Sequence, residues 1–346
     1  MSSGSGYSAS RPGEFDAPSA EELSANLPNY EIEKLIAKGG MGAVYLGKQI
    51  MLNRICAIKL LPHIEDDGGM RMIERFEREA QAMAKLKHAN LIEVYEIGET
   101  TDGMHYFAME HVDGHDMHTL LHTGKLTTEH VFSWIPQICG ALQYAHSQGL
   151  IHRDVKPANI LVNKEGIVKM IDFGLARPSD PKKLVARLTM TNVALGTPDY
   201  AAPEARQTGV DADYRGDLYA IGVILYQMLT GRLPRGAWRP PSALVPGMDP
   251  RFDPIVVKAM SPDPEGRYQQ AQDIAADIHA IRKTPQFQRA GSSSPSSPSP
   301  GQRKTVKRAK RSSGSKSSGN LASFFVAGGI ALGLILIVVL ILMANG

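Results

Sequence analysis

Three glycines stand close together in the segment LIAKGGMGAVYLG, residues 35–47, where backbone amides could approach phosphate oxygens. Gly39, Gly40 and Gly42 lie between two apolar stretches whose alternation predicts strands. A dinucleotide-binding turn would open a helix, and a Walker A loop would continue with G-K-[ST]; neither pattern follows here. The remaining nucleotide-binding interpretation is a glycine-rich hairpin that lies over phosphates, although an ordinary hairpin turn would also use glycines.

A lysine and a carboxylate downstream could extend such a site. Lys59 ends the apolar stretch CAIK, where its ammonium group needs an anionic partner. Glu79 in the predicted helix RFEREA could fix this lysine while the lysine holds the α- and β-phosphates. Glu74 and Glu77 lie on the same helix, so the pattern alone does not single out Glu79, and two unrelated surface charges would look the same.

The elements that would position these groups follow from apolar spacing. The pattern indicates a small, mainly antiparallel β lobe with one long helix, followed by a larger, mainly helical lobe, which is an α+β fold. The expected strands are 32–37, 43–47, 54–61, 91–99 and 104–112, and the expected helices are 70–86, 127–148 and 215–231.

The composition changes sharply along the 346 residues. We expect a disordered N-terminal segment rich in Ser, Gly, Ala and Pro, then a globular domain, a linker that is Ser/Pro-rich and then basic, an uncharged 23-residue stretch and a very short tail. These parts are 1–28, 29–284, 285–320, 321–343 and 344–346.

The uncharged stretch 321–343 predicts a transmembrane helix, since 23 residues at about 1.5 Å each give roughly 35 Å. Residues 303–316 carry seven basic side chains and no acid, which indicates that the preceding domain faces the cytoplasm. Without these seven cations the net charge of +3 becomes −4, so the charge favours a membrane surface over nucleic acid. The basic run could also bind anionic lipid. Two cysteines without a disulfide or zinc pattern fit a reducing compartment.

Residues 151–162, IHRDVKPANILV, match the catalytic loop of protein kinases position by position, and KMIDFGLAR, residues 169–177, matches their metal-binding segment. Over about residues 30–283 the chain resembles bacterial serine/threonine protein kinases of the eukaryotic-like type. The resemblance implies the bilobal kinase fold, transfer of the ATP γ-phosphate to Ser or Thr hydroxyls of proteins, and Mg²⁺ or Mn²⁺ as the metal.

The resemblance assigns roles to several residues of these two segments. Asp154 would orient the substrate hydroxyl and accept its proton, and Lys156 would reach the γ-phosphate. Asn159 and Asp172 would bind Mg²⁺. His152 would be structural, and Phe173, beside Gly174 in the DFG sequence, would set the active or inactive arrangement.

The same resemblance explains the glycine-rich segment. Ala37 replaces the first glycine of the kinase pattern, while Gly39 and Gly42 match the second and third, so we expect only a modest loss of nucleotide affinity. Met109 would be the gatekeeper residue. The ATP-binding residues implied are Ala37, Lys38, Gly39, Gly40, Gly42, Val44, Ala57, Lys59, Glu79, Glu110 and Val112, the last two at the hinge.

Other matches concern structure and regulation. Glu204 of the APE sequence would pair with Arg267, and Asp217 would support the catalytic-loop backbone. Arg153 could bind a phosphorylated residue of the activation segment, residues 175–201. We expect autophosphorylation at Thr189 or Thr191, and we expect Thr197 to hydrogen-bond near Asp154 and Lys156.

Three alternatives stay open. A membrane-anchored pseudokinase scaffold is disfavoured because Lys59, Asp154, Asn159 and Asp172 are all present. A receptor for an external ligand is disfavoured by the three-residue tail, so input would come through the bilayer, the linker, homodimerisation or a cytoplasmic partner. A small-molecule phosphotransferase is disfavoured by the APE sequence.

Histidines 111, 115, 118 and 122 have helical spacing, for which a solvated polar face is favoured over a metal site.

Overall fold

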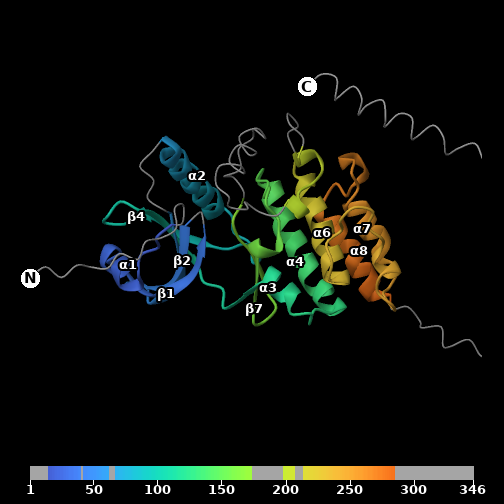
Figure 1. Cartoon of the computed structure of the whole chain (residues 1–346), viewed down its shortest axis with the longest axis horizontal. Coiled ribbons are helices and arrows are strands. Elements are labelled where there is room, and N and C mark those ends of the chain that lie inside the picture. The colour runs from blue at the N-terminus through green and yellow to red at the C-terminus, as the bar shows by residue number, and fades with distance from the viewer. Residues whose placement is uncertain (1–14, 40–41, 62–66, 174–197, 207–212, 285–346) are drawn as a thin grey trace, which may run out of the picture. The chain divides into compact units, whose positions relative to one another are not determined.

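Five antiparallel strands form the sheet of the smaller lobe in the computed structural model (Figure 1). The structure describes residues 15–39, 42–61, 67–173, 198–206 and 213–284. The sheet order is β1-β2-β3-β5-β4, and every neighbouring pair is antiparallel. The strands are β1 Tyr30–Gly39, β2 Gly42–Gln49, β3 Arg54–Leu60, β4 Val94–Glu99 and β5 His105–Glu110.

Side chains alternate across this sheet, so strands β2 to β5 each contribute to two separate apolar clusters. Ala57, Phe107 and Met109 join the cluster that continues into the helical lobe. Helix α2, Asp67–Ala84, packs on this side, where the rings of Phe76 and Phe107 lie 4.9 Å apart. On the opposite side, Tyr45, Cys56 and Ile58 are buried in a second cluster. The sheet thus has one face for the site and another that needs its own cover.

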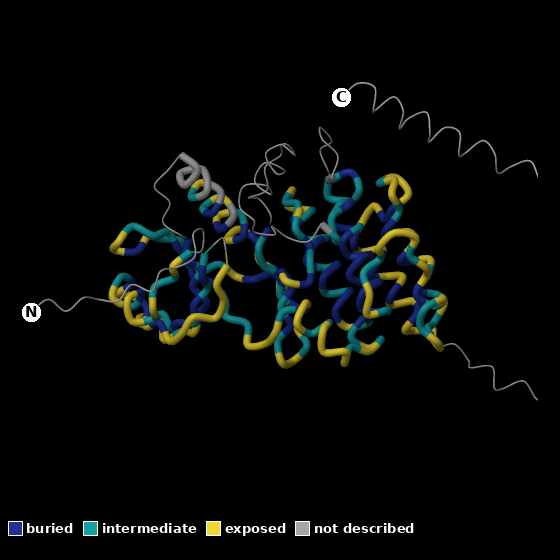
Figure 2. Tube along the Cα trace, in the orientation of Figure 1, coloured by how far each residue is buried: buried dark blue, intermediate teal, exposed yellow. Residues whose placement is uncertain are grey.

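The larger lobe is built around two long helices, α4 Thr128–Ser147 and α6 Arg215–Thr230 (Figure 1). Nearly the whole of α6 is buried (Figure 2), since its residues from Asp217 to Leu229 are almost all inaccessible to solvent. Helices α3 Met117–His122, α7 Phe252–Ala259 and α8 Ala271–Lys283 complete the lobe, with a small sheet in the order β6-β7-β8 formed by Gly114–Asp116, Ile160–Asn163 and Val168–Met170.

The structure confirms the predicted α+β architecture of two lobes, and the predicted strands and long helices match the observed ones to within a few residues. Among the described residues no helix is both long and apolar enough to cross a membrane. The predicted transmembrane stretch 321–343 and the linker that precedes it lie outside the described residues.

A short helix before the first strand corrects the expected disorder of residues 1–28 in their second half. Helix α1, Ala20–Asn26, begins with a capping box in which Ser19 and Glu22 each accept a hydrogen bond from the other's backbone N–H. Leu23 and Leu27 are buried in the second apolar cluster. The Tyr45 hydroxyl donates to the Pro18 carbonyl at 2.7 Å. This segment therefore covers the sheet face that lies away from the site.

Replacement of Leu23 by alanine should lower the free energy of unfolding by about 2–3 kcal/mol, because a fully buried leucine leaves a cavity and this short segment can collapse only partly into it. Urea denaturation measures the change. Leu52→Ala is the matched control, since Leu52 is 64% exposed and should cost less than about 0.5 kcal/mol. Equal stability of the two variants would mean that α1 contributes nothing to the fold.

Candidate active site

Three polar side chains gather in the loop between α4 and β7. The ammonium group of Lys156 donates to Asp154 Oδ2 at 2.8 Å. Asn159, at the end of a 3-10 turn over Pro157–Asn159, donates its amide nitrogen to the Asp154 carbonyl at 2.9 Å and to Asp154 Oδ2 at 3.1 Å. The Asp154 carboxylate is therefore held at a fixed orientation beside a cation.

The backbone of this loop is held by a buried carboxylate from α6. Asp217 accepts hydrogen bonds from the backbone N–H groups of His152 and Arg153, both at 2.9 Å. Arg153 has a φ of 62°, a strained value for a residue with a side chain, and these two bonds help to offset its cost. His146 also contacts Asp217, with Nε2 and Oδ2 at 2.8 Å. The sequence analysis predicted the role of Asp217 but missed His146, because the 71 residues between them leave no local signal.

Asp172 lies next to this loop, two residues after the end of β8. The backbone N–H of Ile171 donates to the Asn159 carbonyl at 3.0 Å, which brings the two predicted metal ligands together. Lys59 from β3 donates to Asp172 Oδ1 at 2.7 Å. Burial raises the pKa of Asp172, but attraction and the hydrogen bond from Lys59 outweigh it, so the pKa lies below its usual range. Asp172 is therefore ionised at neutral pH, as a metal ligand requires.

These donors fit a divalent cation of the Mg²⁺ type. The carboxylate of Asp172 and the amide oxygen of Asn159 are hard oxygen ligands, which Mg²⁺ prefers. Asn159 uses its amide nitrogen on Asp154, so Oδ1 is the atom left for a metal. Mg²⁺ bound by these two residues would offset the negative charge of the phosphates.

The glycine-rich segment forms the hairpin between β1 and β2, with Gly39 opposite Gly42. Gly42 has a φ of 127°, which favours glycine, whereas a Cβ at Gly39 would meet nothing within 4 Å. No contact within the described chain excludes a side chain at Gly39. A glycine at such an open position fits the predicted close approach of a phosphate to the backbone. Ala37 and Lys38 are exposed on β1, and Ala37 has no positive φ. Gly40 lies outside the described residues.

Several predicted ATP-binding residues lie on one side of the same sheet or just after its strand β5. Ala57 is buried on β3 opposite Met109 on β5, and Val44 and Val112 are partly buried against the same apolar cluster. Glu110 ends β5, and its carboxylate accepts a 2.7 Å hydrogen bond from Lys169 on β8. This ion pair joins the end of β5 to β8, and the sequence analysis did not predict it.

Phe173 is buried and stacks on His152, with ring centroids 4.5 Å apart. Burial lowers the pKa of His152, so its ring is neutral. Burial and stacking on Phe173 fit a structural role for His152, which stays a prediction.

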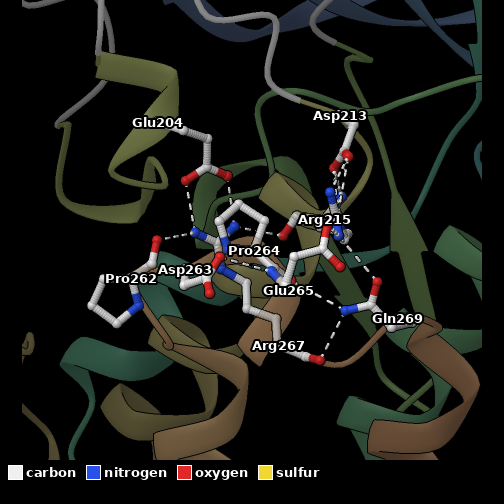
Figure 3. Close-up of polar contacts among 9 residues, drawn as sticks. All are labelled: Glu204, Asp213, Arg215, Pro262, Asp263, Pro264, Glu265, Arg267 and Gln269. Atoms are coloured by element: carbon white, nitrogen blue, oxygen red, sulfur yellow. Dashed lines mark hydrogen bonds and ion pairs between the residues drawn. The ribbon is translucent and has the colours of Figure 1, made fainter.

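A buried ion pair braces the larger lobe (Figure 3). Arg267 donates two 2.6 Å hydrogen bonds to the two carboxylate oxygens of Glu204 and further bonds to backbone carbonyls of Ser261, Pro262 and Arg215. Arg215 in turn contacts Asp213, Glu265 and Gln269. The pairing of Glu204 with Arg267 was predicted, while the connection through Arg215 was not.

Some predicted residues cannot be placed. Gly174, Thr189, Thr191 and Thr197 lie outside the described residues, as does the side chain of Glu79 on α2. Among the described residues no group of three or more His, Cys, Asp or Glu side chains is arranged to hold a metal. The four histidines do not form one helical stripe, because His115 lies on β6 and only His118 and His122 lie on α3.

The glycine-rich hairpin, the Lys59–Asp172 pair and the loop that carries Asp154 have the chemistry that phosphoryl transfer requires. Residues 30–250 match the family model described as protein kinase domain. This match covers most of the chain, and the chain belongs to the protein kinase domain family.

Curated relatives agree with this assignment. The chain is 36% identical over 277 residues to serine/threonine-protein kinase pkn3 of Myxococcus xanthus, covering 73% of this chain and 50% of the relative. It is 38% identical over 270 residues to serine/threonine-protein kinase PknB of Mycobacterium tuberculosis, covering 72% and 42%. The chain thus spans half or less of the length of these relatives.

A solved structure has the same fold. The PknI kinase domain of Mycobacterium tuberculosis, as a C20A_R136N double mutant, is similar with a TM-score of 0.58 and 28% sequence identity. The match covers 73% of this chain and 95% of that one.

Proposed function

We propose that the chain is an ATP-dependent serine/threonine protein kinase. The observation that carries this proposal is the gathering of Lys59, Asp172 and the loop that holds Asp154, Lys156 and Asn159, which come from three separate places in the sequence. The names of the relatives support the choice of Ser and Thr hydroxyls as acceptors.

In the proposed reaction a substrate hydroxyl gives its proton to Asp154 as its oxygen forms a bond to the γ-phosphorus. The bond between that phosphorus and the bridging oxygen of ADP breaks in the same displacement. Lys156, held 2.8 Å from Asp154, donates to the γ-phosphate oxygens, and Lys59 holds the α- and β-phosphates. Asn159 and Asp172 would hold Mg²⁺ or Mn²⁺, consistent with their oxygen donors.

Regulation and location form a further part of the proposal. Autophosphorylation at Thr189 or Thr191 would order the activation segment, and Arg153, fixed by Asp217, supplies a cation for the phosphate. The apolar stretch 321–343 would anchor the chain in the membrane with the kinase domain on the cytoplasmic side, and the basic run before it would contact anionic lipid.

Phosphate incorporation from labelled Mg-ATP by the full-length chain tests the proposal, into the chain itself and into a Ser/Thr peptide library. Lys59→Met should lower incorporation roughly 10²–10³-fold, because the phosphates lose a positioned cation. Lys125→Met is the matched control, since Lys125 is exposed in the loop between α3 and α4. Mass spectrometry should place the incorporated phosphate on Thr189 or Thr191.

Two outcomes would contradict the proposal. Incorporation that Lys59→Met leaves unchanged would mean that another site or a contaminant transfers phosphate. Nucleotide binding without any incorporation by the wild-type chain would favour the pseudokinase scaffold instead. Unmodified Thr189 and Thr191 in an active protein would overturn only the regulatory part.

A further inference from the structure

The loop that follows α6 carries an unusual concentration of positive charge. We call residues 231–240, GRLPRGAWRP, the arginine loop. It contains Arg232, Arg235 and Arg239, and the sequence has no acid anywhere between Asp217 and Asp249. All three arginines are exposed, and the side chain of Arg235 is 70% accessible. The loop therefore presents several cations on the surface of the larger lobe.

The arginine loop is held in a fixed shape. It leaves α6 through Gly231, whose φ of 69° ends the helix in the left-handed conformation. Trp238 packs edge-on against Tyr226 of α6, with ring centroids 5.5 Å apart. Pro234 and Pro240 restrict the backbone further. A rigid loop presents its charges with little loss of conformational entropy when a partner binds.

The arginine loop also contacts a described turn within the predicted activation segment, residues 175–201. Arg235 pairs with Asp199 at 2.7 Å, and Asp199 belongs to a 3-10 turn, Pro198–Tyr200. The hydroxyl of Tyr200 fixes this turn by donating to Gln227 of α6 at 2.6 Å. Helix α6 also connects the arginine loop to the catalytic residues, because Asp217 in its first turn holds the backbone of His152 and Arg153 beside Asp154.

The charge of this region stays positive after its internal contacts are counted. Among the described residues Arg235 is the one arginine of the three that pairs with a carboxylate. Arg239 donates to the neutral carbonyl of Ala243 at 3.0 Å. In the part of the chain that the structure describes, Asp199 thus offsets one of the three cations, and Arg232 and Arg239 have no carboxylate partner.

We propose that the arginine loop selects protein substrates with acidic side chains close to the phosphorylated Ser or Thr. This inference rests on the proposed kinase activity, and it names the class of substrate that the site would take. Acidic side chains at the correct distance from the acceptor would pair with Arg232 and Arg239, which raises both encounter rate and affinity. Such a preference should weaken as salt screens these exposed charges.

Peptide phosphorylation by the full-length chain tests the inference. The peptides share one threonine acceptor, with three Asp, three Asn or three Lys residues placed either before or after it. For one of these two placements, the wild-type kcat/KM should be roughly five- to tenfold higher for Asp than for Asn peptides, the sum of a few exposed pairs. Arg232→Gln/Arg239→Gln should remove this preference, and Arg232→Glu/Arg239→Glu should shift it toward the Lys peptides.

The control is Arg282→Gln on α8, a side chain that is 58% exposed and far along the chain from the arginine loop. It should keep the wild-type preference, and all variants should retain the Thr acceptor activity on Asn peptides.

Activity without any preference for Asp peptides would overturn the inference while leaving the kinase proposal intact. So would a preference that both double variants retain. Arginine-dependent binding to vesicles of anionic phospholipid, with no peptide preference, would assign the loop to lipid instead. Absence of all phosphorylation would count against the kinase proposal and not against this inference alone. The Lys59→Met comparison tests the kinase proposal separately.

Discussion

Replacement of Asp154 by asparagine is expected to lower kcat for phosphoryl transfer roughly 10²–10⁴-fold, while the KM for ATP stays close to that of the wild type. The change removes the group that accepts the hydroxyl proton, and a positioned general base contributes about this factor. Asparagine has nearly the same shape, so the backbone held by Asp217 should keep its conformation. Steady-state kinetics with labelled ATP measures both constants.

Asp273→Asn is the matched control, because Asp273 is exposed in the first turn of α8. It removes one carboxylate without touching the site and should leave kcat unchanged. Thermal unfolding of both variants checks that the fold is intact. If Asp154→Asn kept more than about a tenth of the wild-type kcat, Asp154 would not be the base and its role would be limited to orientation.

Replacement of Arg267 by glutamine should lower the free energy of unfolding by about 3–5 kcal/mol, which is more than the loss expected for Leu23→Ala. The Arg267 side chain is fully buried, and its partner Glu204 is 12% accessible, so the substitution leaves a carboxylate in a dry site without its cation (Figure 3). Three backbone carbonyls lose a donor as well. Guanidinium denaturation of the purified chain measures the change in the free energy of unfolding.

Two further variants make this result specific. Arg282→Gln removes an exposed arginine and should cost less than about 1 kcal/mol. The double variant Arg267→Met/Glu204→Met removes both charges and should be more stable than Arg267→Gln, since no uncompensated ion remains. A double variant less stable than the single one would show that packing, and not the unpaired charge, sets the cost.

The long elements of the fold could be predicted because their apolar spacing is visible in any window of the sequence. The helix expected at 70–86 is observed as α2 Asp67–Ala84, and the one expected at 215–231 as α6 Arg215–Thr230. Helix α1 was missed since it has only seven residues in a stretch rich in Ser, Ala and Pro. Its signal was present: Ser19 and Glu22 have capping-box spacing, and Leu23 and Leu27 lie on one helical face.

The site could not have been assembled from local patterns. Lys59 and Asp172 are 113 residues apart, and their 2.7 Å contact depends on how β3 meets the end of β8. The resemblance to protein kinases supplied this pairing. Contacts particular to this chain, such as Glu110 with Lys169 or Arg235 with Asp199, were not predicted, because exposed and half-exposed charges have many alternative partners in sequence.

The two cysteines of the chain are both sealed within apolar clusters, Cys56 in the sheet and Cys139 in α4. Burial raises the pKa of each thiol, so neither forms the thiolate that reacts with oxidants or alkylating agents. The two native thiols should therefore not react with thiol-specific reagents while the chain is folded. A single cysteine introduced on its surface, for instance in the arginine loop, would carry a fluorophore or spin label at one known position without removal of the native thiols.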